Sequence, residues 1–292
     1  MPSTRDIRRR IKSVKNTAQI TKAMQMVAAA KMRKAQQAAL VGRPYAKLLN
    51  VMMAEAAAGT VGFDHPLMLS RPVNKRAVII VSSDRGLCGA LNGNLFREAA
   101  KLDKNTTVFI TAGKKAAQFV ARTKRTLVGE FNYKDTPEFA EARAISKFVQ
   151  QLFLKGEVDA VDILFPRFVN TLTQQPVTVP FLPIGKISAA TAGVNAPKEE
   201  LAAHDTHEVF EFEPDEETVL GELLPHSLNF QMHQILLETK ASEQSARMVA
   251  MKNATDNAKQ IIKDLTLEYN KLRQANITKE LLEITTAQMA VG

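Results

Sequence analysis

Two short segments of the sequence carry the residue types that could bind a phosphate. Residues 81–92 (VSSDRGLCGALN) place two glycines between an apolar run and a helical pattern, and backbone N–H groups at a helix N-terminus can hold an anion. Gly113, followed by two lysines, forms a second strand-to-helix turn. Neither segment has the GxGxxG or GxxxxGK[ST] spacing. We therefore interpret both as structural turns, with a nucleotide site as the less favoured alternative.

Other residues with chemical potential are scattered. Cys88 is the single cysteine of the chain, which excludes a disulfide framework, and a small buried hydrophobe is the favoured interpretation over a catalytic thiol. His204 and His207 lie near acidic residues in a polar segment, but their spacing matches no established zinc motif. We find no paired carboxylates or Ser/His/Asp pattern. The sequence thus predicts no catalytic site, no metal and no cofactor.

The positive charge is concentrated at the N-terminus. The formal net charge is +9, and residues 1–57 hold twelve Lys and Arg against two Asp and Glu. Such an arm could attract an acidic partner or nucleic acid. It lacks the interleaved aromatics and the recognised modules of nucleic-acid-binding proteins. No run of about 18 apolar residues occurs, so the sequence predicts no membrane span.

The elements that would position these residues begin with two long terminal helices. Apolar residues at Ile7, Ile11, Val14 and Ala18 follow the 4-3-4 spacing of a coiled-coil seam, as do Ala28, Met32, Ala35 and Ala39. Gly42 and Pro44 interrupt the first helix and predict a kink. Near the C-terminus, Ala258, Ile262, Leu265, Tyr269 and Leu272 repeat the spacing, and Pro225 should kink or restart that helix.

Helix length then indicates the architecture. Helices over 4–58 and 227–289 would be roughly 80 and 90 Å long, whereas a compact globule of this size is about 50 Å across. The economical solution is an antiparallel coiled coil of the two ends that projects from a globular middle. We expect a coiled-coil helix over 1–58, an α/β domain over 76–190, a surface loop over 191–213 and a second coiled-coil helix over 214–292.

The middle segment has the alternating rhythm of an α/β fold. The expected strands cover 77–81, 107–111, 127–131, 160–165 and 177–182, and the expected helices cover 91–102, a segment opened by Gly113, and 136–154. Strands that alternate with helices favour a largely parallel sheet covered on both faces. The fold class is therefore α/β with long helices, namely a Rossmann-like central domain and an antiparallel coiled coil.

Four blocks of the sequence resemble the gamma subunit family of the rotary ATP synthases. They are ITKAMQMVA at 20–28 with KMRK at 31–34, SDRGLCG at 83–89, SEQSARMVAMK at 242–252 with ATDN at 254–257, and ITKELLEI at 277–284. The resemblance extends over essentially the whole chain, and four long blocks in the same order are highly specific.

The resemblance implies a central rotor shaft in a proton-translocating ATP synthase, which is not itself catalytic and binds no cofactor. In the family, the coiled coil stands inside a ring of three alpha and three beta subunits, with the tip near 283–292 deep in the ring. The α/β domain contacts the epsilon subunit and the c-subunit ring. The lack of a presequence leads us to expect a peripheral protein on the cytoplasmic face of a bacterial inner membrane.

The resemblance also implies which residues contact these partners. Arg247 and Gln274 are carried over as polar contacts with the beta subunits. Met24 lies on the facing part of the N-terminal helix, while Thr278 and Glu280 help to hold the rotor or meet the ring.

Two other classes of function compete with the rotor. A nucleic-acid-binding coiled coil, suggested by the basic arm, predicts affinity that falls steeply with salt. A nucleotide-dependent enzyme, suggested by the α/β middle, predicts specific nucleotide binding by the isolated chain. The rotor predicts neither, and predicts co-purification with an alpha/beta hexamer whose ATPase rate depends on this chain.

Overall fold

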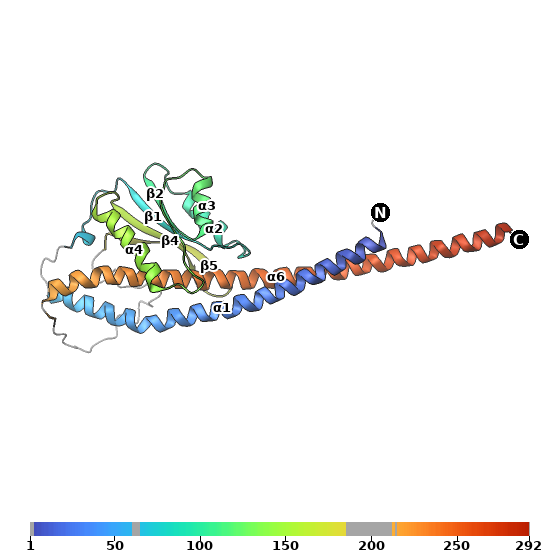
Figure 1. The fold of residues 1–292 in the computed structure, drawn as a ribbon, viewed down its shortest axis with the longest axis horizontal. Coiled ribbons are helices and arrows are strands. Elements are labelled where there is room, and N and C mark those ends of the chain that lie inside the picture. The colour runs from blue at the N-terminus through green and yellow to red at the C-terminus, as the bar shows by residue number, and fades with distance from the viewer. Residues whose placement is uncertain (1–2, 60–64, 185–211, 214, 292) are drawn as a thin grey trace. The chain divides into compact units, whose positions relative to one another are not determined.

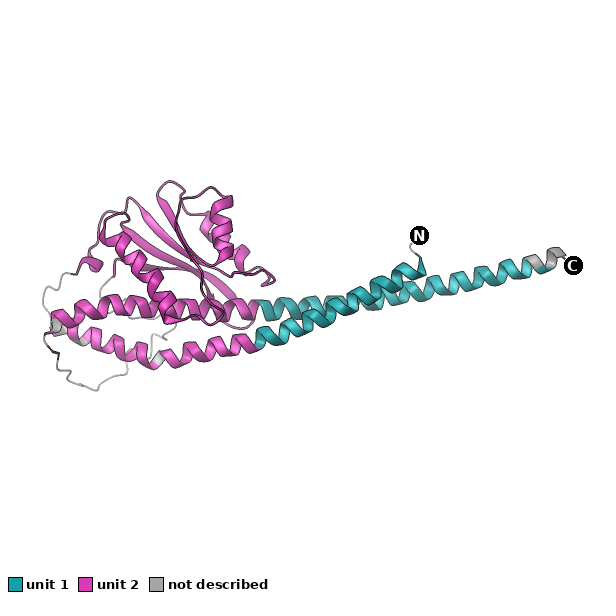
Figure 2. Cartoon of the chain, viewed as in Figure 1, with its two compact units in different colours: residues 1–29, 247–292 teal, residues 30–246 magenta. Residues whose placement is uncertain are grey.

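The computed structural model describes residues 3–59, 65–184, 212–213 and 215–291, which form two compact units. The first unit combines residues 1–29 with 247–292, and the second comprises residues 30–246 (Figure 2). Two long helices, α1 (Thr4–Gly59) and α6 (Glu216–Val291), contribute residues to both units (Figure 1). None of the helices in the described part of the chain has an apolar stretch that could cross a membrane.

The second unit is built around a five-stranded sheet with the strand order β3-β2-β1-β4-β5. The strands are β1 (Arg76–Val81), β2 (Thr107–Ala112), β3 (Leu127–Phe131), β4 (Ala160–Phe168) and β5 (Gln174–Leu182). The first four are parallel, and β5 pairs antiparallel with β4. The largely parallel sheet is confirmed, with an antiparallel strand at one edge.

Helices cover both faces of this sheet, as expected for apolar strands such as β1. On one face, Val78 and Ile80 pack with α2 (Leu91–Ala100) and α3 (Lys114–Arg122). On the other face, Ala77 and Ile79 belong to a larger core with α4 (Phe139–Leu154), the short η1 helix (Pro66–Met68), and parts of α1 and α6. The predicted α/β class with long terminal helices is therefore confirmed.

Within the second unit, α1 and α6 pair in opposite directions. The Tyr45 hydroxyl lies 2.6 Å from His226 Nε2, and the Tyr45 ring centroid lies 4.9 Å from that of Phe230. One turn earlier in α1, a Cβ atom on Gly42 would lie only 2.2 Å from the amide nitrogen of Gln234, which is later in α6. Gly42 thus allows the close approach of the two helices, and the pairing is antiparallel.

The order of the contacting residues along α1 and α6 shows that the first unit is also an antiparallel helix pair. The Arg8 guanidinium donates to the Tyr269 hydroxyl, and the Thr21 and Thr255 hydroxyls are 2.7 Å apart. The predicted seam of α1 is buried or half-buried at every position, as is that of α6 from Ala258 to Leu272. The spacing that predicted the coiled coil therefore identifies the contacting side chains.

The proline at residue 225 does not restart the helix. α6 continues through Pro225, and α1 likewise continues through Gly42 and Pro44. A proline removes one helical hydrogen bond, but Leu220, Leu224 and Leu228 flank Pro225 and are all buried in the core. Tertiary packing of the neighbouring turns maintains the helix where local propensity alone would end it.

Candidate functional site

The residues expected to contact partners all lie in the first unit. Met24 is half-buried on α1, and Arg247 has 9% of its surface exposed on α6. Gln274, Thr278 and Glu280 are exposed on α6. The Thr278 hydroxyl donates to the Gln274 carbonyl at 2.9 Å. This bond fixes the hydroxyl against its own helix, and the Gln274 side chain is exposed.

The last part of α6 is exposed and carries apolar side chains. Residues 273–286, the end stretch, are exposed throughout. It contains large apolar side chains that are between 46% and 60% exposed, namely Ile277, Leu281, Leu282 and Ile284. The predicted seam of α6 ends at Leu272, three residues after Tyr269, which contacts Arg8 near the start of α1. Apolar side chains exposed together on one element are typical of a protein-binding surface.

The candidate phosphate-binding turn that begins at Gly113 has its backbone donors occupied within the chain. At the start of α3, the Lys114 N–H donates to Asp84 Oδ1 at 3.0 Å, and the Lys115 N–H donates to the Ser83 carbonyl at 3.2 Å. The Ala116 N–H donates to Ser82 Oγ at 2.8 Å. These are the groups that an anion at this helix N-terminus would need. The turns after β1 and β2 therefore bind each other, which supports the structural interpretation.

Gly113 is required by that arrangement. Its φ of +106° lies in a region that L side chains rarely adopt, and a Cβ atom would lie 2.3 Å from the Ser82 carbonyl oxygen. The same carbonyl accepts a hydrogen bond from the Tyr133 hydroxyl at 2.8 Å. The glycine in the Gly-Lys-Lys sequence thus serves the contact between two strand ends.

Cys88 is a buried thiol at this end of the sheet. It is 2% exposed, and it packs with Leu91 and with Ala246 of α6. Its sulfur lies 3.4 Å from the Asn92 side-chain nitrogen and 3.8 Å from Ser83 Oγ. Within the described residues, no group of three His, Cys, Asp or Glu side chains could hold a metal ion. His204 and His207, like most of the expected surface loop over 191–213, lie outside the described residues.

The helix α6 fills the space beside the carboxyl ends of β1 and β4. In open α/β sheets this is the usual position of a ligand, because the strand order reverses between these two strands. Here the Phe168 N–H donates to Glu238 Oε1 at 3.1 Å, and the Ser245 hydroxyl donates to the Thr171 carbonyl at 2.9 Å. Side chains of α6 therefore bind backbone groups at the carboxyl end of β4 and in the connection that follows it.

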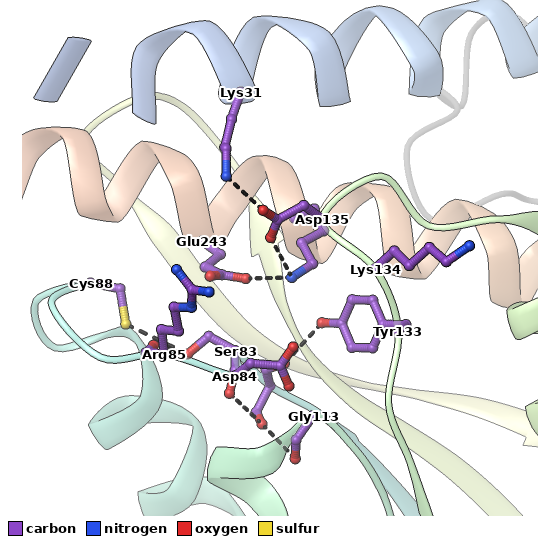
Figure 3. A network of polar contacts seen from close by, with 12 residues as sticks. Lys31, Ser83, Asp84, Arg85, Cys88, Gly113, Tyr133, Lys134, Asp135 and Glu243 are labelled. Carbon is purple, nitrogen blue, oxygen red and sulfur yellow. Dashed lines mark hydrogen bonds and ion pairs between the residues drawn. The ribbon is translucent and has the colours of Figure 1, made fainter. Parts of the chain in front are cut away.

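A buried lysine is the centre of this junction. Residues 235–247 of α6, the junction stretch, are all buried. Lys240 is 1% exposed, and its Nζ lies 3.1 Å from Glu243 Oε2, 3.7 Å from Asp135 Oδ1 and 4.6 Å from the Tyr133 ring centroid. Figure 3 shows Asp135, Glu243 and Tyr133 gathered at this point, with Lys31 of α1 reaching Asp135 from the other side.

The charges in this network shift two pKa values. The hydrogen bond from Lys31 lowers the pKa of Asp135, although partial burial opposes the shift, and the charge of Lys240 lowers it further. Burial raises the pKa of Tyr133 well above its ordinary value of 10.0, and the negative charge of Glu243 adds to the effect. At neutral pH, Asp135 is therefore ionised and Tyr133 is a neutral hydrogen-bond donor.

Reasoning from the sequence did not identify Lys240 or Asp135. The signal available for Lys240 was its position one turn after Leu236, on the buried face of α6, with an acidic residue three positions later. No comparable signal marks Asp135, which lies in the connection between β3 and α4. Its contact with two distant helices follows only from the tertiary fold.

Comparison with known proteins gives consistent similarities over the full length. The family model described as ATP synthase matches residues 3–291. The ATP synthase gamma chain of Opitutus terrae is 47% identical over 298 residues, and that of Methylacidiphilum infernorum is 45% identical over 297 residues. Both matches cover 100% of this chain and 100% of the relative.

Solved structures with the same fold come from mitochondrial complexes. A chain of the Euglena gracilis mitochondrial ATP synthase (OSCP/F1/c-ring, rotational state 3) superposes with a TM-score of 0.67 at 19% identity, covering 99% of this chain and 94% of that chain. A chain of the Tetrahymena thermophila central stalk and c-ring gives a TM-score of 0.59 at 22% identity, with coverages of 80% and 99%. At these identities the likeness concerns the fold alone.

Proposed function

This chain belongs to the ATP synthase gamma chain family, and from that premise we propose that it is the central rotor shaft of a proton-translocating ATP synthase. In this role it couples ion flow through the membrane sector to ATP synthesis or hydrolysis on the beta subunits. The shaft is not itself catalytic, because ATP and the ion bind to other subunits. Its task is mechanical, and its residues act by contact.

The observation that carries this proposal is the exposed end of α6. The end stretch leaves Leu281 and Leu282 58% and 60% exposed in the isolated chain, which favours a surrounding protein surface. A sleeve formed by the alpha and beta subunits would cover these side chains. The small residues of the α1 seam, such as Ala28, allow a slender helix pair that fits inside such a sleeve.

The proposed contacts can be ordered by what the residues can reach. Gln274, Thr278 and Glu280 are exposed, so their side chains can meet the ring directly. Met24 is half-buried and presents only part of its side chain. Arg247 is 9% exposed and interacts within the chain, so its contact with a beta subunit requires a change of side-chain conformation.

Rotation would act on the catalytic subunits through differential contact. An asymmetric shaft presents a different surface to each of the three beta subunits, and each subunit is thereby biased toward a different conformation. The bias on a subunit cannot exceed the difference in contact free energy between its alternative conformations. Turning the shaft moves each bias to the next subunit, which links the angle of rotation to the state of each catalytic site.

The further partners follow from the same role. We propose that the α/β unit contacts the epsilon subunit and the c-subunit ring, and that nucleic acid is not a partner. Membrane association would then be peripheral, through the complex, on the cytoplasmic face of a bacterial inner membrane. The basic residues of 1–57 would face acidic protein surfaces in the complex.

The test is reconstitution of the ATPase with and without this chain. Alpha and beta subunits are combined with the full chain, or with a variant ending at residue 269, and ATP hydrolysis and ATP-driven proton pumping are measured after assembly with the membrane sector. We expect the full chain to restore both, and the truncation to abolish pumping while circular dichroism shows that the sheet unit is folded. Equal pumping by the truncated chain, or no dependence on the chain, would contradict the proposal.

A further inference from the structure

Asp135 is contacted by both long helices. Its Oδ2 atom accepts a hydrogen bond from Lys31 Nζ of α1 at 2.6 Å, and its Oδ1 atom lies 3.7 Å from Lys240 Nζ of α6. Asp135 itself belongs to the connection between β3 and α4. One carboxylate thus joins the β3–α4 connection to α1 and to α6, and we refer to Lys31, Asp135 and Lys240 as the clasp; Figure 3 labels Lys31 and Asp135.

On the α6 side, the clasp is one of several contacts. Lys240 also pairs with Glu243, and Glu238 and Ser245 bind the backbone of the β4–β5 hairpin. The whole junction stretch is buried. Loss of Asp135 would therefore leave α6 attached to the sheet.

On the α1 side, the neighbouring contacts are of another kind. The seam residues next to Lys31 in the second unit are Met32, Ala35 and Ala39, which are apolar and mostly small. Apolar burial favours association but has no direction, so a seam of small side chains resists sliding along the helix axis weakly. The hydrogen bond from Lys31 to Asp135 is directional, and it ties this part of α1 to the sheet.

We propose that Asp135 is a positioning residue, which holds α1 in fixed register against the sheet and α6 when torque acts on the chain. The proposal rests on the function proposed above, since only a shaft under torque needs such a restraint. Without the clasp, α1 near Lys31 is held by its apolar seam alone and shifts more readily against the sheet, while α6 and the later part of α1, whose Leu49 and Met53 lie in the core, stay in place. Part of the work of ATP hydrolysis is then lost as internal motion of the shaft.

The first test measures the restraint itself by hydrogen exchange on the full chain. We expect Asp135→Asn and Lys31→Ala each to raise amide exchange in α1 around residue 31 by about two- to fivefold, the range that an ion pair between half-exposed partners supports. Exchange in the junction stretch should change less. Glu98→Gln is the matched control, because Glu98 of α2 forms an exposed ion pair with Lys101, the residue that follows this helix. Unchanged exchange around residue 31 in both variants would overturn the clasp.

The second test measures coupling in the reconstituted complex. The ratio of protons pumped to ATP hydrolysed should fall in Asp135→Asn and Lys31→Ala, and should stay at the wild-type value in Glu98→Gln. A merely structural defect would lower assembly and both rates together without lowering the ratio. Raised exchange with an unchanged ratio would overturn the role in coupling. If the wild-type chain fails to restore a coupled ATPase, the proposed function fails, while the exchange experiment still decides whether the clasp exists.

Discussion

Two stretches of α6 depart from the usual rule that charged side chains are exposed and apolar side chains are buried, each in a different way. In the junction stretch of α6, charged residues such as Lys240 and Glu243 are buried, at 1% and 3% exposure. In the end stretch, leucines 281 and 282 are more than half exposed. The first reversal is stable within the chain because the buried charges find partners. The second has no such compensation within the described residues, and in the proposed function the sleeve of alpha and beta subunits would supply it.

The comparison shows how one long helix can serve two purposes. Burying a charge is costly unless it is paired and hydrogen-bonded, so the junction stretch is specific for one arrangement of α6 on the sheet. Leucines that are more than half exposed contribute little to the stability of the isolated chain, and in the proposed function their contacts form on assembly. Substitutions in the junction stretch should therefore change folding, and those in the end stretch should change coupling.

The largest effect is expected from removing one partner of the buried ion pair. Glu243→Ala leaves the Lys240 ammonium in a buried site with Asp135 as the remaining acid, at 3.7 Å. An uncompensated buried charge typically costs about 3–5 kcal/mol. Because Asp135 remains as a partner of Lys240, we expect the free energy of unfolding to fall by about 3 kcal/mol. The free energy of unfolding of the full chain in urea gives the measurement.

The control for this prediction replaces both charges. In Lys240→Met with Glu243→Leu, apolar groups of similar size replace the pair, which is often neutral for stability. We expect this double variant to unfold at a higher urea concentration than Glu243→Ala. Equal loss in the two variants would mean that the polar contacts of Glu243, and not an unpaired charge on Lys240, determine the stability of the junction stretch.

A smaller effect is expected for leucines of the first unit, where a buried and an exposed position can be compared directly. Leu265→Ala removes a seam side chain that is 9% exposed and should destabilise the helix pair by about 2–3 kcal/mol. Leu281→Ala changes a side chain that is 58% exposed and should alter stability by less than about 0.5 kcal/mol. Hydrogen exchange over 258–272 measures the first effect, and proton pumping by the complex should detect the second.

Two outcomes of the comparison between Leu265→Ala and Leu281→Ala would contradict the separation of folding and coupling along α6. If Leu281→Ala destabilised the isolated chain as much as Leu265→Ala, the end stretch would be part of the fold of the first unit. If it left both stability and pumping unchanged, the exposed leucines would have no part in coupling.

Periodicity explains how much of this fold could be predicted. The 4-3 spacing of Ile7, Ile11 and Val14 found the seam because a coiled coil repeats one contact many times. Strand β3 was predicted with its observed bounds, and β2 to within one residue. The antiparallel direction of β5 was not predicted, because an apolar run such as 177–182 has the same appearance in either direction. Pro225 does not restart α6, because buried leucines on both sides outweigh a local helix breaker, while the predicted kink at this proline stays a prediction.

The junction is harder to predict because its contacts join residues far apart in the sequence. Asp135 is more than 100 positions from both Lys31 and Lys240, and no spacing rule connects them. Its neighbours in sequence, Lys134 and Thr136, are typical of a polar connection. Burial of Lys240 depends on the sheet, the β3–α4 connection and α6 meeting at one place. The sequence can predict each element, but the site exists only where they meet.

The smallest effect concerns Asp135, which contacts the junction stretch through Lys240 but has 60% of its own side chain exposed. Because the hydrogen bond from Lys31 lowers its pKa below the ordinary 3.8, its ionised form contributes stability at neutral pH. This contribution is lost as the pH falls through the lowered pKa. The unfolded state has the higher carboxyl pKa and binds the proton first, so acid favours unfolding until the folded state is protonated as well. Solvent screening keeps it below about 1 kcal/mol. Lys31→Ala should remove most of it, so the two proteins should differ in stability at neutral pH and converge as the pH falls from the ordinary carboxyl pKa through the lowered one. Other carboxylates with lowered pKa values, such as Asp103 and Asp159, contribute equally to both proteins and cancel in the difference. A difference that persisted unchanged into acid would assign the effect of Lys31 to packing of its methylene chain, and the clasp would then not depend on charge.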